Sequence, residues 1–338
     1  MAIRKPINAA VLFSLLGTLY GPTAIAETTI PMDIEIGGFI RADLGFGDRY
    51  GDAAGEDRIA VSKAALSATA TSGNVKGIFV LGTEISSEPI VGTNDGNIDI
   101  KDAFIVWGDD SFNLSVGAQP LLFGLKSAGY PGDHSIQASV EFGGGGAIPV
   151  ANQAGASALF NWSFGGSSSL RFGVFDNRGY TPDGSVFDAE DGSTVADNFM
   201  IQWRVDDLGG SGIYAVIGTE NVYLGGDNND TGSISTVGLG WKNAFIDISA
   251  EYFIFEDTVL GVPDEEEEYL IAELAFTPNE MWKIYLDYSE ADLIEVKTSI
   301  VGLNYNYSSA LMVTFEGSTE DYGGSDVSSV DFRLTLSY

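Results

Sequence analysis

The stretch MDIEIGGFIRADL, residues 32–44, alternates between two kinds of side chain along its whole length. Every second residue from Met32 to Leu44 is apolar or glycine, and the residues between them are mostly charged. Successive side chains of a β-strand point to opposite faces, so this period of two predicts a strand with one apolar and one mainly polar face. The pattern returns at residues 156–164, 244–254 and 330–338, and no comparable run has the period of a helix. The sequence therefore predicts an all-β protein.

The connections between these strands fall into two classes that alternate along the chain. Very short ones occur at residues 71–74, 108–110, 165–167, 206–210, 242–243, 277–280 and 308–309. Mostly longer ones occur at residues 45–57, 86–97, 120–152, 177–194, 220–231, 257–265, 289–294 and 320–326. An even number of strands with short turns at one end and long loops at the other is typical of bacterial outer-membrane barrels. We therefore expect a 16-stranded antiparallel transmembrane β-barrel with short periplasmic turns and long extracellular loops, because a closed barrel leaves no unpaired sheet edge in lipid.

The positions of the tryptophans support this interpretation independently. All of them lie within a few residues of a short turn, and none lies in a long loop: Trp107, Trp162, Trp203, Trp241 and Trp282. Aromatic rings gather where a membrane protein meets the interface with water, so a barrel explains this placement. The alternative, a soluble β-sandwich with buried tryptophans, gives no reason to place them all at one end.

The composition excludes several classes of function. The 338 residues include 16 Lys and Arg against 48 Asp and Glu, and the formal net charge is −32. A chain this acidic repels polyanions, so we expect no nucleic-acid partner. The chain has no cysteine and one histidine, His134, which excludes disulfides, thiolate chemistry and multi-histidine metal centres. The positive mean hydropathy of +0.09 nevertheless indicates that many apolar side chains leave water.

The first 26 residues have the layout of a secretory signal peptide. Arg4 and Lys5 precede a mostly apolar run over residues 7–20, and Ala24-Ile25-Ala26 gives the small-x-small pattern of a cleavage site. The apolar run is short of the roughly 20 residues that span a bilayer, which argues against a membrane anchor. We expect cleavage after Ala26, so that residues 27–338 form the transmembrane barrel domain.

Several short motifs carry a resemblance to known proteins. The last strand, VDFRLTLSY at residues 330–338, ends in an aromatic residue and resembles that of the trimeric porins of Gram-negative outer membranes. The motifs GFIRAD (residues 38–43), VGAQ (116–119) and VEFGG (140–144) are most similar to the DcaP-like porins. The resemblance implies an outer-membrane porin for the passive diffusion of small hydrophilic solutes and ions. It also implies a homotrimer in contact with outer-membrane lipid and lipopolysaccharide.

The resemblance further implies that the longest gap between strands, residues 120–152, folds into the lumen as a constriction loop. The residues expected at this constriction are Lys126, Asp133, Glu141 and Phe142. Charged side chains at the narrowest part of a pore govern which ions pass. The alternative is an extracellular loop that only covers the mouth of the barrel.

Alternation along the strands assigns the wall of the lumen. The basic residues expected to face inward are Arg41, Lys63, Lys76, Arg171, Arg204, Lys283 and Arg333. The acidic residues expected there are Asp33, Glu35, Asp43, Glu84, Asp247, Glu251, Glu273, Asp287, Glu316 and Asp331. Opposed charges would set a transverse field across the pore, although for any one residue a structural pair across strands is an equal alternative. Because acidic residues predominate, we expect a weak preference for cations that salt screens.

Neither a catalytic constellation nor a resident cofactor is expected. No recognisable motif ties a Ser or Asp to His134, so we expect no enzymatic activity. The acidic loops, including residues 264–268, lack EF-hand spacing and would take loosely bound divalent cations at most. Two alternatives to a diffusion channel stay open at this point: an outer-membrane hydrolase that uses His134, and a structural or adhesive barrel with a plugged lumen.

Overall fold

The computed structural model of the chain describes residues 32–47, 58–84, 99–119, 123–125, 156–164, 168–175, 199–225, 230–258, 265–292, 296–323 and 326–338. The expected signal peptide lies outside these ranges and stays a prediction. The strands are β1 (Asp33–Gly47), β2 (Arg58–Ser72), β3 (Val75–Glu84), β4 (Asp99–Gly108), β5 (Phe112–Ala118), β6 (Ala156–Phe164), β7 (Ser168–Phe175), β8 (Phe199–Val205), β9 (Ile213–Gly225), β10 (Asp230–Lys242), β11 (Ile246–Thr258), β12 (Glu265–Asn279), β13 (Trp282–Ala291), β14 (Val296–Asn306), β15 (Leu311–Tyr322) and β16 (Asp326–Ser337).

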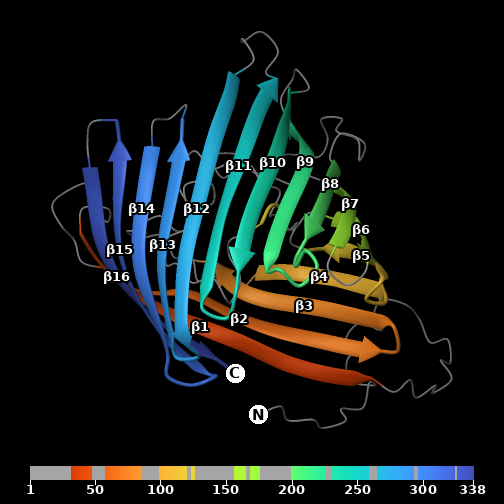
Figure 1. Cartoon of the computed structure of the whole chain (residues 1–338). Coiled ribbons are helices and arrows are strands. Elements are labelled where there is room, and N and C mark those ends of the chain that lie inside the picture. The colour runs from red at the N-terminus through yellow and green to blue at the C-terminus, as the bar shows by residue number, and fades with distance from the viewer. Residues whose placement is uncertain are drawn as a thin grey trace.

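The sixteen strands form one closed barrel (Figure 1). Each strand pairs with its neighbours in sequence, and β1 closes the ring by pairing with β16. Every pair is antiparallel. The predicted 16-stranded antiparallel barrel is therefore confirmed. Within the described ranges, no helix is long and apolar enough to cross a membrane.

The two faces of the barrel wall have opposite characters. Side chains of β14 and β16 alternate between buried and exposed positions, as the period of two requires. The exposed face carries large apolar side chains, such as Val301 (57% exposed) and Leu334 (40% exposed). The buried face carries many polar side chains, such as Thr298 and Asp331, beside apolar ones such as Ile300. A soluble protein would reverse this arrangement, so the outer face suits lipid and the inner face encloses a polar lumen.

The tryptophans lie where the sequence predicted them. All five are on the outer face beside the short turns, and their side chains are between 38% and 51% exposed. The belt includes stacked and tilted ring pairs, for example Trp282 with Tyr305, whose ring centroids are 4.4 Å apart. An aromatic belt of this kind marks one membrane interface, at the end of the barrel that carries the short turns.

Two expected loops are shorter than the sequence suggested. The connection expected at residues 220–231 shrinks to 226–229, and the one expected at 320–326 shrinks to 323–325. The predicted boundaries are wrong because they place Glu220 and Glu320 in the loops. Both are buried strand residues on the inner face of the wall, since a polar lumen accepts carboxylates at inward-facing positions.

Candidate functional site

The segment that follows β5 turns into the barrel. Phe123 is 1% exposed and packs on the inner face of the wall. Its cluster contains Leu159, Met200, Ile234, Phe253, Tyr269 and Ala291. Leu125 packs in the same way against Tyr214 and Val216. The expected third loop therefore begins inside the barrel, as the predicted constriction requires.

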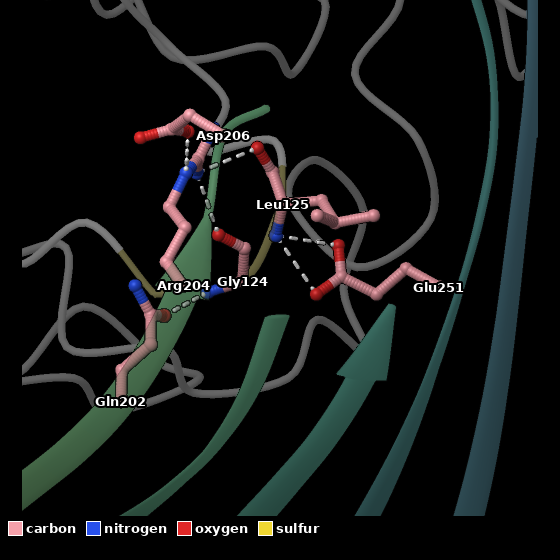
Figure 2. Close-up of polar contacts among 6 residues, drawn as sticks. All are labelled: Gly124, Leu125, Gln202, Arg204, Asp206 and Glu251. Carbon is pink, nitrogen blue, oxygen red and sulfur yellow. Dashed lines mark hydrogen bonds and ion pairs between the residues drawn. The ribbon is translucent and has the colours of Figure 1, made fainter. Parts of the chain in front are cut away.

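Side chains of the barrel wall bind the backbone N–H groups of this segment (Figure 2). The Gly124 N–H donates to Oε1 of Gln202 over 2.7 Å. The Leu125 N–H donates to both carboxylate oxygens of Glu251, each at 2.9 Å. The Thr236 hydroxyl donates to the same carboxylate over 2.7 Å. Hydrogen bonds to an ionised acceptor are stronger than neutral ones, which offsets the desolvation of a Glu251 side chain that is only 5% exposed.

Arg204 binds the carbonyl groups of the same segment. Its Nη1 donates to the Gly124 and Leu125 oxygens at 3.3 Å and 3.1 Å. Its Nε donates to Oδ1 of Asp206 over 2.6 Å, in the turn that leads to β9 (Figure 2). Arg204 faces inward as predicted. Its guanidinium, however, binds the loop segment and Asp206 instead of pointing into the open lumen. We call Gln202, Arg204 and Glu251 the loop anchor.

Gly124 is required by the way the segment passes the loop anchor. Its φ of +87° lies in the left-handed region, which residues with a Cβ rarely adopt. A Cβ at this position would stand 2.7 Å from Oε1 of Glu251. Any larger residue would therefore disturb the carboxylate that holds Leu125.

The basic residues expected near the start of the chain occupy inward-facing strand positions. Arg41 in β1 is buried, and its guanidinium carbon lies 5.0 Å from the centroid of the Phe39 ring. Lys63 in β2 pairs in register with Arg41. Lys76, close to the short turn between β2 and β3, is exposed. Arg41 and Lys76 therefore place positive charge at different heights of this side of the barrel.

Arg171 in β7 lies further round the wall and is hydrogen-bonded to it. Its Nε donates to Oδ1 of Asn161 over 2.7 Å, and the Asn161 amide donates to Oδ1 of Asn113 over 2.9 Å. This chain of hydrogen bonds crosses β7, β6 and β5. It restricts the position of the guanidinium.

Most of the buried carboxylates lie on β9–β16. Glu316 and Asp331 face each other directly across β15 and β16, and both are buried. The Tyr285 hydroxyl donates to Oε2 of Glu316 over 2.6 Å, and the Ser329 hydroxyl donates to Oδ2 of Asp331 over 2.9 Å. Hydrogen bonds from these hydroxyls offset part of the cost of burying the carboxylates. Buried carboxylates outnumber buried cations on β9–β16, so this part of the wall carries a net negative charge.

Three buried inward-facing carboxylates were missed by the sequence analysis: Asp102, Glu220 and Glu320. For two of them a signal existed. The alternation through Tyr214, Val216 and Gly218 continues to Glu220 with the same period, and β15 continues in the same way to Glu320. Asp102 lies beside a register shift between β3 and β4, which no period of two can reveal.

The other constriction residues, Lys126, Asp133, Glu141 and Phe142, lie outside the described ranges, and so does His134. Their roles stay predictions. Among the residues whose placement the structure gives, no group of three or more His, Cys, Asp or Glu could hold a metal ion.

Known proteins share the fold of this chain without sharing its sequence. No protein-family model and no curated protein match it. The outer membrane channel DcaP of Acinetobacter baumannii superposes with a TM-score of 0.59 at 12% identity, over 94% of this chain and 100% of that chain. An anion-selective porin from Comamonas acidovorans gives a TM-score of 0.63 at 13% identity, over 91% and 100%. Salmonella typhi OmpF gives 0.63 at 11% identity, over 90% and 98%.

Identities this low establish the fold alone. The predicted resemblance to Gram-negative porins is confirmed at that level, and the predicted location in the outer membrane agrees with these neighbours. The chain folds as a Gram-negative outer-membrane porin does.

Proposed function

We propose that this chain is a non-enzymatic channel for the passive diffusion of small hydrophilic solutes and ions across the outer membrane of a Gram-negative bacterium. The observation that carries the proposal is the polar inner wall of a closed barrel into which the third loop begins to fold. Sixteen strands enclose an aqueous channel when their inner face is polar, rather than a core filled by side chains. The loop anchor would hold the constriction in place.

The channel would prefer cations weakly. Carboxylates predominate among the buried charged residues of β9–β16, and hydroxyl groups donate to Glu316 and Asp331. Arg204 is occupied by the loop segment and Asp206. Fixed carboxylates raise the local cation concentration, and salt would screen this effect beyond a Debye length of about 8 Å at 0.15 M.

The assembled form would be a homotrimer surrounded by outer-membrane lipid and lipopolysaccharide. Export would depend on the expected signal peptide, residues 1–26. Both parts of the proposal come from the sequence and its resemblance to trimeric porins. Unheated detergent electrophoresis tests the trimer, because a barrel that migrates as a monomer under mild conditions would contradict it.

The central experiment is conductance in planar lipid bilayers. Purified protein should give discrete channel openings, and a potassium chloride gradient should give a reversal potential of the cation-selective sign that shrinks as salt rises. Heat-denatured protein is the control. A folded barrel without conductance would contradict the channel, and an anion-selective sign at low salt would contradict the charge assignment. Liposome swelling with charged and neutral solutes would then identify the preferred solute.

A further inference from the structure

The outer face of the barrel is not evenly filled by its apolar side chains. Two grooves of about 520 Å³ and 710 Å³ are open on the outside of β7–β13. The first, groove A, is lined by Ile201, Trp203, Thr219, Ser235, Tyr252 and Ile254, among others. The second, groove B, is lined by Leu239, Trp241, Ala250, Ala272, Leu274 and Tyr288, among others.

Both grooves arise in the same way from the register of the strands. In groove A the short side chains of Thr219 and Ser235 face each other across β9 and β10. Ile201 and Ile254 stand at the two ends of that rung. These four residues form one row, or rung, of cross-strand neighbours. The two short side chains form the floor of a notch, and the two isoleucines form its sides.

Groove B repeats this construction two strands further round the barrel. Ala250 and Ala272 face each other across β11 and β12, with Leu239 and Tyr288 at the ends of the rung. The two grooves thus have different sequences and one geometry.

Each groove also has a tryptophan at its rim, one rung nearer the short turns. The indole N–H of Trp203 donates to the Ser168 hydroxyl over 2.8 Å, and that of Trp241 donates to the Ser211 carbonyl over 3.1 Å. These bonds direct the polar edge of each ring to the membrane interface. The ring itself is left as an apolar wall of the groove.

The outward-facing side chains of the grooves offer few polar groups. Glu273 and Asp287 also border groove B, but they occupy inward-facing strand positions. The Ser235 hydroxyl donates to the Thr219 hydroxyl at 3.4 Å, and the floor of groove B is alanine. Thr219 lies six residues along β9, about 14 Å deep at a tilt near 45°, which is roughly the middle of an apolar band about 25 Å tall. The grooves therefore run from the interface with the short turns toward the centre of the bilayer.

We propose that each groove binds one acyl chain of a phospholipid from the periplasmic leaflet. The occupant follows from continuity with the lipid-facing surface, because the grooves open among its most exposed apolar side chains, such as Ile217 and Leu239. A flexible hydrocarbon chain fills a notch of this shape, and its headgroup lies at the level of the tryptophans. The proposal rests on the outer-membrane placement of the proposed function.

The test fills each notch separately and counts retained lipid. Wild type, Ser235→Leu, Ala250→Leu and the double variant are reconstituted with a mixture of palmitoyl-oleoyl phosphatidylethanolamine and lipopolysaccharide. They are then extracted into mild detergent and analysed by native mass spectrometry. Ala68→Leu is the matched control, because Ala68 is a small outward-facing residue between Ile36 and Phe79 and lies in neither groove. Bilayer conductance is measured for every variant, so a failure of the channel is distinguished from a failure of the lipid sites.

Wild type and Ala68→Leu should retain two phospholipids per chain, each single variant one, and the double variant none. Retention at a filled notch should weaken about tenfold, since losing the burial of roughly two methylene groups corresponds to that factor. Equal retention by all variants would overturn the proposal. So would a variant that keeps its lipids and loses its oligomeric state, because the groove would then be a contact between copies. Retention of lipopolysaccharide in place of phospholipid would overturn the assignment to the periplasmic leaflet.

Discussion

The two halves of the barrel wall treat their inward-facing charges differently. In β1–β8 the cations Arg41, Arg171 and Arg204 contact an aromatic ring, an asparagine and a loop backbone. In β9–β16 carboxylates outnumber cations on the inner face. The buried members of that set are Glu220, Glu251, Glu273, Glu316, Glu320 and Asp331, with Arg333 as the buried cation.

A count of charges alone therefore does not describe the pore, because the contacts of the charged groups also matter. In one half, Arg171 is held against the wall by Asn161. In the other half, Glu316 and Asp331 accept hydrogen bonds from hydroxyl groups. Both halves bind residues 123–125, where the third loop begins, because Gln202 and Arg204 come from β8 and Glu251 from β11.

The largest effect is expected from removing most of the third loop, which continues from residues 123–125. Deleting residues 129–148 should raise single-channel conductance severalfold without unfolding the barrel, because the narrowest part of a pore dominates its resistance. Deleting residues 183–192 from another expected loop is the control and should change conductance much less. Equal conductance of the loop 129–148 deletion and wild type would show that this segment does not narrow the lumen.

Breaking the loop anchor should have the next largest effect. Glu251→Ala removes the acceptor of the Leu125 N–H and of the Thr236 hydroxyl, and an unpaired buried donor costs about 1–3 kcal/mol. We expect noisy, larger openings and faster proteolysis of the loop, with the barrel itself still folded. Glu251→Gln keeps one acceptor oxygen, so its openings should be intermediate in size and noise between those of wild type and Glu251→Ala. Quiet wild-type openings from Glu251→Ala would mean that the anchor does not control the pore.

The charge asymmetry is tested directly by neutralising each half. The double variant Glu273→Gln, Asp287→Asn should lower the cation-to-anion permeability ratio by about twofold, since a unit charge a few ångströms away in water contributes about 1 kcal/mol or less. Arg171→Gln, on the other half, should raise that ratio slightly. Reversal potentials at low salt measure both. Shifts of the same sign in the two variants would refute the division of the wall.

The smallest effect is expected at the short turns. One turn of the first half is capped by an aspartate, which titrates, and two turns of the second half are capped by asparagines, which do not. Asp109 accepts the N–H groups of Ser111 and Phe112, and Asn243 and Asn279 accept equivalent bonds in two turns of the other half. These bonds hold the pKa of Asp109 below its ordinary value of 3.8. The stability they add is present above that value and is lost as pH falls through the lower pKa of the folded state.

Asp109→Asn keeps the acceptor oxygen and removes the titration. We expect the heat-modifiable transition of wild type to move slightly to lower temperature between about pH 5 and pH 3, with a smaller movement in the variant. Asp109→Ala should lower the transition at both pH values. Identical pH profiles for wild type and Asp109→Asn would show that titration of Asp109 does not affect the stability of the barrel.

The sequence predicted the strands and their faces because alternation and burial obey the same period. Arg41 and Asp331 were assigned inward from neighbours such as Ile40 and Val330, and both are buried. The tryptophans identified the turn end for a similar reason, since an amphipathic ring has one favourable depth in a membrane.

The loop anchor could not be predicted from such patterns. Leu125 and Glu251 are 126 residues apart, and their bond depends on a left-handed glycine beside them. Register also escaped prediction. Groove A needs Thr219 to pair with Ser235 rather than with the residue beside it, and strand composition is indifferent to that choice. Contacts made by loop backbone and by cross-strand register are properties of the assembled barrel.

The seam between β1 and β16 contributes to the kinetic stability of the assembled barrel. Nine register pairs, from Phe39 with Ser337 to Gly47 with Ser329, join the two ends of the barrel domain. Parting any seam within hydrocarbon bares backbone groups at a cost of several kcal/mol each, so persistence is governed by an unfolding barrier more than by equilibrium. During assembly, before the seam forms, the same backbone groups are unpaired. Until Tyr338 exchanges its backbone hydrogen bonds with Gly38, the sheet has two open edges that would pair with any other strand they met.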